Sequence, residues 1–354
     1  MDFDLDETRR ELRDLAAGLL DREAASADPR RLWTALGRAG LPGACLPEDA
    51  GGAGLGPVGL AVILREIGSR AAPVPAYASL CLAAVPIAAH GTPAQRASLA
   101  GLAAGETVLT GAYREPGLTG EVRATARRDG DGFVLDGAKT FVPYAEQAAR
   151  ILVPARVEGA DVGVFLVEPS EVDLSPHPAA TGEPMSRVGL RGVQIGGDAL
   201  LGGEADGAAW RTLRRSAVAG AVALVSGVID GALTLTTEHV RTREQFGRAL
   251  AGFQAVTMQI ADVYIAKRAV DVAMWAGVWR MSVDADDTDE VLAIAAYNAC
   301  DPVLKALYTC QHLHGGIGLD VTYPLHRYFA WGKHYAHLLG GAEAQLDAVT
   351  HAIV

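Results

Sequence analysis

The sequence predicts an α+β protein in which a helical N-terminal region, an antiparallel β region and a C-terminal helical bundle follow one another. Three observations predict this order. Amphipathic segments separated by glycine and proline fill the first hundred residues, short β-type runs with hairpin turns follow, and the helical period returns after Gly203. With 354 residues, 50% of them hydrophobic, the chain is long enough for more than one domain with a packed core.

The first region, residues 1–105, is expected to be helical. Apolar residues recur at helical spacing in four segments, Leu5–Asp21, Pro29–Gly37, Val58–Gly68 and Ala76–Ala89. Between the second and third of these, Leu41–Gly56 is so rich in glycine and proline that we expect a loop.

The middle region, residues 106–203, is expected to be a compact antiparallel β domain. Thr107–Tyr113 is strand-like, and the turn sequence DGDG at 129–132 joins the strands expected at 122–128 and 133–135. A second hairpin is expected from Ile151–Val157 and Val162–Val167. The segments Gly192–Ile195 and Ala199–Leu201 are expected to close the domain.

The last region, residues 204–354, is expected to be a four-helix-type bundle. Helical periodicity predicts helices at about 207–243, 251–282, 287–314 and 322–339, with a short one from 342. The first of them is apolar almost all round and rich in small residues, among them Gly220, Gly227 and Gly231. Such a helix approaches its neighbours closely, so we place it at the centre of the bundle.

Composition and charge argue against several functions. A net charge of −11 argues against nucleic-acid binding, which needs basic side chains. No basic segment precedes an apolar block at the N-terminus, and the longest uncharged apolar run, Ala217–Ile229, is too short to span a bilayer. The four cysteines and the pair His312 and His314 lack metal-site spacing. We therefore expect a cytoplasmic protein with reduced cysteines, no membrane insertion and no metal.

Two stretches of the last region carry a family resemblance. Arg241–Gly247, which reads RTREQFG, and Gly252–Gln254 resemble the arginine, phenylalanine and glutamine signature of acyl-CoA dehydrogenases. Gln311–Gly318, which reads QHLHGGIG, with Tyr323–Pro324 and Leu339–Gly341, resembles the second signature of that family. The α–β–α order and the length agree with this family, so the resemblance covers essentially the whole chain.

The resemblance implies an FAD-dependent oxidoreductase that removes one hydrogen each from Cα and Cβ of an acyl-CoA and passes electrons to an electron-transfer acceptor. In this family the flavin lies between subunits, and residues of the two signatures reach the FAD of the neighbouring subunit. Carried over, the FAD-binding residues are Arg243, Phe246, Gln254, Gln311, Gly315 and Gly316. The chemistry of these residues agrees with FAD binding, because arginine suits a pyrophosphate, an aromatic face suits adenine, and glycine lets the backbone approach an anion.

The sequence departs from the family where the chemistry takes place. Loss of the α proton needs a carboxylate as base. Members of the family place a glutamate just before a glycine near the last helices, or early in the first long helix of the last domain. Gly340 and Ala217 occupy these two positions here. No catalytic residue is therefore predicted on this chain.

The β region departs from the family pattern as well. The family shows a hydroxyl residue before Glu-Pro, where this chain has Arg114 in the sequence REPG. A second stretch, Gly137–Pro143, ends in a proline that offers a flavin neither a hydroxyl nor an N–H. The groups expected to hold this subunit's own isoalloxazine ring are thus lost, whereas those expected to help a neighbour's FAD are kept.

Three hypotheses follow. In this asymmetry the chain resembles the base-lacking subunits of heteromeric bacterial acyl-CoA dehydrogenases that shorten steroid side chains. The leading hypothesis is therefore a subunit of an α2β2 enzyme whose homologous partner carries the base. A second is a self-sufficient homo-oligomer that uses Glu343, although a glutamate there is also favoured simply by the first turn of a helix. A third is a structural paralogue that binds no flavin, against which the retained signature residues argue. Flavin monooxygenase chemistry remains open on fold alone.

Overall fold

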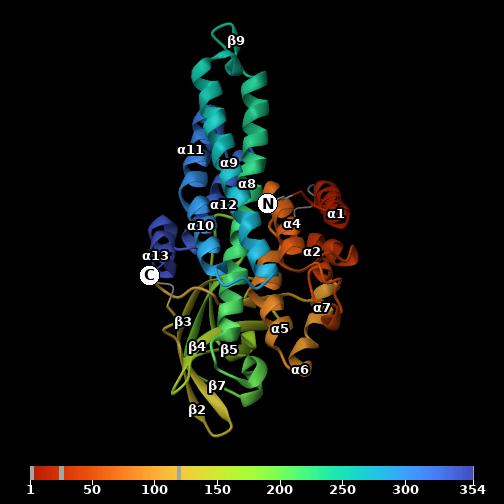
Figure 1. The fold of residues 1–354 in the computed structure, drawn as a ribbon, viewed down its shortest axis with the longest axis vertical. Coiled ribbons are helices and arrows are strands. Elements are labelled where there is room, and N and C mark those ends of the chain that lie inside the picture. Colours follow the sequence, from red (N-terminus) through yellow and green to blue (C-terminus); the bar gives the residue numbers. More distant parts are fainter. Residues whose placement is uncertain (1–3, 24–27, 118–120, 354) are drawn as a thin grey trace. The chain divides into compact units, whose positions relative to one another are not determined.

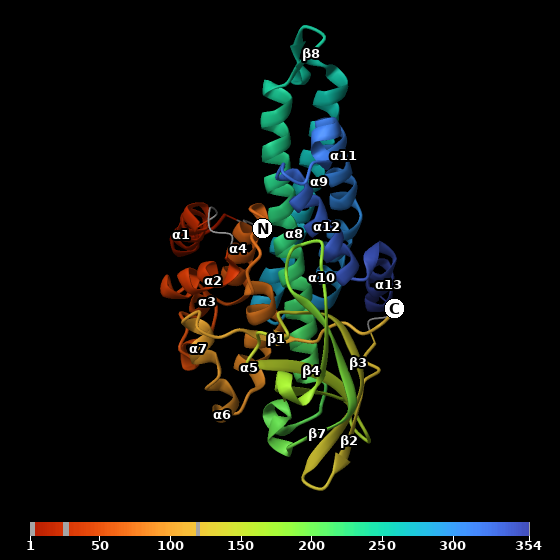
Figure 2. The same ribbon diagram turned by 180° about the vertical axis from the view of Figure 1, so that it is seen from behind.

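The computed structural model describes residues 4–23, 28–117 and 121–353, which form two compact units (Figures 1 and 2). One unit, here the β unit, is drawn from residues 21–60 and 73–220. The other, here the bundle unit, is drawn from residues 1–20, 61–72 and 221–354. The division into domains at 105 and 203 stays a prediction.

The predicted N-terminal helices are present. The first three are α1 (Glu7–Glu23), α2 (Pro29–Arg38) and α4 (Gly56–Ser69). Two short helices that were not predicted, α6 (Pro93–Arg96) and α7 (Leu99–Ala103), follow later in this region. The prediction of a loop over 41–56 was wrong in part, because this segment contains the short helix α3 (Leu41–Ala44) and a 3-10 turn at 48–50. Pro42 stands in the first turn of α3, where a missing N–H costs nothing, and Leu41 and Leu46 are buried.

The helix predicted at 76–89 is π-helical over Tyr77–Ala84 and continues as α5 (Val85–His90). Pro86 lacks an N–H and its ring excludes the carbonyl of Leu82 from the usual helical position, which favours the wider turn. The Ser79 hydroxyl donates to the carbonyl of Leu109 at 2.9 Å, so this helix is tied to the first strand.

The sheet has seven strands, and the prediction that it is antiparallel holds for most of the strand pairs but not for all of them. The strands are β1 (Leu109–Gly111), β2 (Thr125–Asp129), β3 (Gly132–Pro143), β4 (Arg150–Val157), β5 (Val162–Val167), β6 (Asp173–His177) and β7 (Met185–Ile195). Both predicted hairpins, β2–β3 and β4–β5, are confirmed. However, β1 and β2 both pair with β4 in parallel. The long connection between β1 and β2 makes this crossover possible.

Two further differences concern strands. The segment Ala199–Leu201, which was expected to close the domain, forms no regular strand: Ala199 and Leu201 belong to two 3-10 turns, and Leu200 between them makes a single antiparallel β-bridge with Phe165. The edge strand β6 was not predicted, because its sequence, DLSPH, is mostly polar and contains a proline.

The bundle consists of α8 (Ala208–Thr242), α9 (Gln254–Ser282), α10 (Thr288–Cys300), α11 (Pro302–His314), α12 (Leu325–Leu338) and α13 (Gly341–Ile353). Figure 1 shows α8 and α9 side by side, joined at their far ends by the hairpin of β8 (Glu244–Gln245) and β9 (Arg248–Ala249). The single helix expected over 287–314 is two helices. Pro302 cannot continue a helix from Cys300, so the chain turns at Asp301 and starts again.

The central position of α8 depends on its glycines. A Cβ atom on Gly227 would lie 2.0 Å from the carbonyl oxygen of Arg65 in α4, and one on Gly231 would lie 2.3 Å from that of Ser69. Among the described residues α8 is the helix long and apolar enough to cross a membrane. Since 67% of its most apolar stretch is buried, it resembles the core helix of a folded domain.

A buried carboxyl lies in the β unit. Glu183 is 4% exposed, and its Oε2 has no hydrogen-bond partner. Burial raises the pKa of Glu183 to about 8, so this side chain is mostly protonated at neutral pH. The neighbouring Tyr144 is also buried, and its hydroxyl is likewise without a partner.

We expect the Gly227→Ala variant to lose on the order of 3 kcal/mol or more of unfolding free energy, because the new Cβ meets backbone that cannot move aside. Gly277→Ala is the control. Its Cβ would lie 2.8 Å from the Cδ2 atom of Leu292, the flexible end of a side chain. Urea unfolding of both variants measures the difference. Equal stabilities would contradict the close packing of α8.

We expect the Glu183→Gln variant to be more stable than the wild type at pH 8.5 and about equally stable at pH 4.5. The unfolded chain releases the Glu183 proton above its usual pKa of 4.5, whereas the folded chain holds it until about pH 8. The unfolding free energy of the wild type therefore decreases by on the order of a few kcal/mol between these two pH values. The glutamine variant has no proton to release, so its unfolding free energy does not show this decrease. Thermal unfolding against pH measures it. Exposed Glu158→Gln should show no such difference.

Candidate functional site

The first signature forms the tip of the α8–α9 hairpin in the bundle unit. The N–H of Arg243 donates to the carbonyl of His239 at 2.8 Å, which continues the helical pattern by one residue. Two residues, Phe246 and Gly247, then make the turn between β8 and β9 with φ values of 54° and 77°. Positive φ at both central residues is the geometry of a tight hairpin, and glycine supplies one of them without strain.

This turn presents an aromatic ring and a guanidinium to solvent. Phe246 is 92% exposed, and the Arg243 side chain is exposed and forms no ion pair within the described part of the chain. The ring of Phe253 supports Phe246 edge-on at 6.3 Å between centroids, and the guanidinium of Arg248 lies 3.9 Å from the Phe253 ring centre. Gln254 begins α9 directly afterwards and is exposed. Arg243, Phe246 and Gln254 therefore lie at the same end of the α8–α9 hairpin.

The second signature forms the end of α11 and the 3-10 turn Gly315–Leu319. Gly315 has a φ of 62°, and a Cβ atom on either Gly315 or Gly316 would meet no other atom within 4 Å. Gln311 is half-buried, and its Nε2 donates to the carbonyl of Gly318 at 3.3 Å. Gln311 thus holds the turn, while the two glycines leave its backbone open.

A stacked pair of histidines joins the two signature segments. The ring of His239, one helical turn before Arg243, stacks on that of His314 at 4.3 Å and 20°. His314 Nδ1 is bonded to the carbonyl of Cys310 at 2.8 Å, which makes Nδ1 the protonated nitrogen. Burial, and to a smaller degree the neighbouring His239, lowers the pKa of His314. Burial, and to a smaller degree the Arg243 guanidinium, also lowers the pKa of His239, so both rings are neutral at neutral pH. The stack connects the end of α8 with the end of α11.

Sequence reasoning missed this pair. His314 was considered only with His312, as a weak metal candidate, because its true partner lies 75 positions earlier in the chain. Within the described residues no group of histidine, cysteine and acidic side chains is arranged to hold a metal ion. All four cysteines are buried, without a disulfide among the described residues.

The residues of the tip fit one end of a dinucleotide cofactor. An unpaired arginine suits a pyrophosphate, an exposed phenylalanine suits the face of an adenine, and an open glycine turn lets N–H groups approach a phosphate. This surface is therefore suited to binding a cofactor.

Neither family base position provides a carboxylate. Gly340 has a φ of 91° and Gly341 one of 83°, a backbone that side-chain-bearing residues rarely adopt. Ala217 is 1% exposed, and its carbonyl accepts a hydrogen bond from the Tyr77 hydroxyl at 3.2 Å. Glu343 is exposed in the first turn of α13. This is the position expected for a glutamate that stabilises a helix N-terminus.

In the β unit, the two departing stretches lie against each other. The N–H of Thr140 donates to the carbonyl of Arg114 at 2.9 Å. The neighbouring residues form a buried ion pair, with 2.6 Å between Lys139 Nζ and Glu115 Oε1. Burial raises the pKa of Glu115, but the Lys139 ammonium and two backbone N–H groups lower this pKa by a larger amount. The Glu115 carboxylate therefore stays ionised at neutral pH. Glu115 and Lys139 therefore fix the geometry of both stretches.

The side chains at this place differ from those expected of a flavin-ring site. Arg114 is 9% exposed and donates to the carbonyl of Gly117 at 3.3 Å. Pro143 ends β3 and accepts the hydroxyl proton of Thr110 through its own carbonyl at 2.6 Å. Phe141 is 47% exposed and has a φ of 51°. The face thus offers a bulky cation and a proline in place of small hydroxyl donors, and it does not fit an isoalloxazine ring.

Comparisons with known proteins agree with the architecture. Residues 4–106 match the family model described as "Acyl-CoA dehydrogenase, N-terminal domain", and residues 210–354 match "Acyl-CoA dehydrogenase, C-terminal domain". The chain is 36% identical to acyl-CoA dehydrogenase FadE28 of Mycobacterium tuberculosis over 98% of this chain and 97% of the relative. It is 33% identical to FadE27 of the same organism over 90% and 87%.

Solved structures give the same result. The steroid acyl-CoA dehydrogenase Tcur3481–Tcur3483 superposes with a TM-score of 0.90 at 37% identity, covering 98% of both chains. The ChsE4–ChsE5 complex of M. tuberculosis superposes with a TM-score of 0.92 at 30% identity over 100% of this chain and 99% of that one. The chain belongs to the acyl-CoA dehydrogenase family of FAD-dependent oxidoreductases, which act on the CH–CH bond of acyl-CoA thioesters.

Proposed function

We propose that this chain is the base-lacking subunit of a hetero-oligomeric acyl-CoA dehydrogenase, assembled as α2β2 with a homologous subunit that carries the catalytic carboxylate. The observation that carries the proposal is an asymmetry. The tip that suits a dinucleotide keeps its signature residues, with Arg243 and Phe246 exposed, whereas Gly340 and Ala217 stand at the base positions. A subunit of this kind completes a partner's site and has none of its own.

The relatives support a heteromer and indicate the substrate class. One structural neighbour is named as a complex of two proteins, ChsE4 and ChsE5, and another as a steroid acyl-CoA dehydrogenase made of Tcur3481 and Tcur3483. By this similarity we assign a bulky, steroid-like acyl-CoA as substrate. The enzyme would work in the cytoplasm and pass electrons to an electron-transfer acceptor.

The chain's own residues would bind the partner's cofactor. Arg243 would neutralise the pyrophosphate, Phe246 would cover the adenine, and the open backbone at Gly315 and Gly316 would approach the phosphates. Gln254 would add an amide at the start of α9, and Gln311 would keep the glycine turn in shape. When bound, FAD supplies the acceptor for the hydride from Cβ.

The two alternatives are less well supported. A self-sufficient homo-oligomer would need Glu343 as its base, yet Glu343 is exposed on the first turn of α13. A purely structural paralogue would not need an exposed phenylalanine and an unpaired arginine at one tip, because exposed apolar surface without a function is a liability.

We expect Arg243→Gln, in the complex with its partner, to weaken FAD retention about tenfold or more, and the double variant with Phe246→Ala to weaken it further. The loss of a charged contact to phosphate explains this size. The measurement is flavin absorbance of the purified complex after extensive gel filtration. Arg241→Gln is the control, since Arg241 is an exposed arginine in the last turn of the same helix. Unchanged occupancy in the double variant would contradict the assignment.

We expect Gly340→Glu to give no dehydrogenase activity in this chain alone. The new side chain would sit at a φ of 91°, and the ring-binding face of the β unit would still be missing. Gly340→Gln has the same strain without the charge and serves as control. Turnover of any acyl-CoA by the glutamate variant alone, and not by the glutamine variant, would show a complete flavin site and overturn the proposal.

A further inference from the structure

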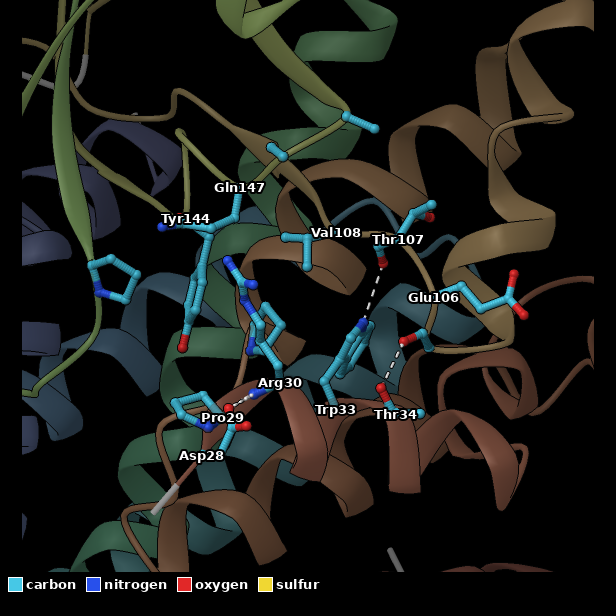
Figure 3. A pocket seen from close by; sticks show the side chains of 15 residues that line it. Asp28, Pro29, Arg30, Trp33, Thr34, Glu106, Thr107, Val108, Tyr144 and Gln147 are labelled. Atoms are coloured by element: carbon cyan, nitrogen blue, oxygen red, sulfur yellow. Dashed lines mark hydrogen bonds between the residues drawn. The ribbon is translucent and has the colours of Figure 1, made fainter. Parts of the chain in front are cut away.

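A cavity in the β unit and one side of α9 in the bundle unit both lie outside the proposed dehydrogenase function. The cavity, of about 550 Å³, lies between the start of α2 and the segments 105–108 and 144–149 (Figure 3). Its lining combines the cation of Arg30 with the carboxylates of Asp28 and Glu106, so its charge is mixed and selects no one ligand. The side of α9, by contrast, is mostly apolar along the whole helix.

Four large apolar residues of α9 form an exposed row. Met258, Ile265, Val272 and Trp279 follow one another at intervals of seven residues and are between 39% and 63% exposed. Seven residues make nearly two helical turns, so the four side chains lie on one side of the helix, along about 32 Å. The opposite side, which includes Val270, is buried in the bundle. Continuous exposed apolar surface of this kind marks a site of interaction with another molecule.

The neighbouring positions complete the pattern of a coiled-coil seam. The residues that stand three places before or four places after a member of the row are Ala255, Asp262, Ala269, Ala276 and Val283, and all are at least partly exposed. Apolar residues at alternating intervals of three and four pack one helix against another. Alanine at every second place lets the two helices approach closely. The row and these five residues are here called the α9 seam.

The α9 seam is complementary to itself when two copies run antiparallel. With Ala269 of one copy opposite Ala269 of the other, Ile265 faces Val272, and Met258 faces Trp279 nearer the ends. The smallest side chain then lies on the twofold axis, where the helices are closest, and larger side chains pair on either side.

The charged residues on this side of α9 agree with the antiparallel direction. In a parallel pairing Asp262 would face Asp262 of the second copy, which places two like charges together in an apolar seam. In the antiparallel pairing Asp262 lies opposite Ala276, and Arg280 follows one helical turn later as a basic neighbour. The exposed Arg268 lies at the edge of the seam, where water screens its charge.

An α2β2 assembly needs an interface of this kind. The tip that suits a flavin joins this chain to its partner subunit, and the resulting αβ pair needs a second contact to become a tetramer. Two copies of one chain meet about a twofold axis through the same patch on each copy. The self-complementary α9 seam is such a patch.

We propose that the α9 seam packs against the α9 seam of a second copy of this chain, antiparallel and with Ala269 at the twofold axis. The choice of a second copy as the occupant rests on the proposed α2β2 assembly. Because each FAD-binding tip lies at the start of α9, the antiparallel pairing places the two tips at opposite ends. Each tip can then reach a different partner subunit.

The register is tested by treating the complex, and the chain alone, with a short bis-maleimide cross-linker. The four native cysteines are buried, so an introduced thiol reacts by itself. Ala269→Cys should link two copies of this chain, because packed helices lie about 8–10 Å apart. Ala255→Cys should give no such link, since residues 255 of the two copies would lie about 42 Å apart. Adding Val283→Cys to Ala255→Cys should restore the link.

The assembly is tested with the double variant Ile265→Glu/Val272→Glu, which places carboxylates opposite each other across the seam. We expect the association of αβ pairs into α2β2 to weaken about tenfold or more, because apolar contacts are lost and like charges meet. Flavin should stay bound to the αβ pair. Sedimentation measures the mass and absorbance measures the flavin. Leu15→Glu, at an exposed leucine of α1, is the control and should leave the tetramer intact.

Several results would overturn the proposal. They are no link from Ala269→Cys, equal links from Ala255→Cys and Ala269→Cys, links to the partner subunit only, and a tetramer that survives the double glutamate variant. Thermal unfolding first confirms that each variant is folded. If no complex with a partner forms, the proposed function fails, whereas cross-linking of the chain alone still decides the pairing of α9.

Discussion

The structure depends on how closely α8 is packed. Glycines at 227 and 231 let α4 approach until its carbonyl oxygens occupy the space of a Cβ atom. This contact brings Arg65 of α4 within 3.2 Å of Asp230, and Lys267 of α9 lies 3.1 Å from the same carboxylate. The Ser226 hydroxyl donates to Asp271 at 2.6 Å and accepts from Arg65. This network is partly buried, and removing one of its charged partners would leave the opposite charge uncompensated, so the network helps to hold the three helices together.

A rigid pair of helices explains how an exposed tip can be specific. The β8–β9 turn extends from the ends of α8 and α9, so the places of Arg243 and Phe246 are set by helices and not by a long loop. The stack of His239 on His314 then ties the glycine turn to the same end. A surface built this way is preorganised for a partner's cofactor. In the β unit, by contrast, the framework is kept but the cofactor-facing side chains are not. The buried pair of Glu115 and Lys139 preserves its framework, while the side chains that would face a flavin have changed.

Much of the fold was predictable, because helical and strand periods are local signals. The two hairpins, the long α8 and the helical ends of the chain follow from them. The parallel pairing of β1 and β2 with β4 was not, since strand order depends on long-range contacts. Pro302 marked a helix break that periodicity hid. The signature residues were found through family resemblance, whereas the His239–His314 stack appears only when distant segments meet.

The central claim is that this chain helps to bind a flavin that it cannot hold alone. The most direct test is the visible absorption spectrum of the chain purified alone, repeated after co-expression with a homologous dehydrogenase subunit that carries the carboxylate. We predict flavin bands only in the co-expressed sample, with about one FAD for each pair of chains. Stoichiometric flavin in the chain purified alone would contradict this, because it would mean that Arg114 and Pro143 are compatible with a complete site on one kind of subunit.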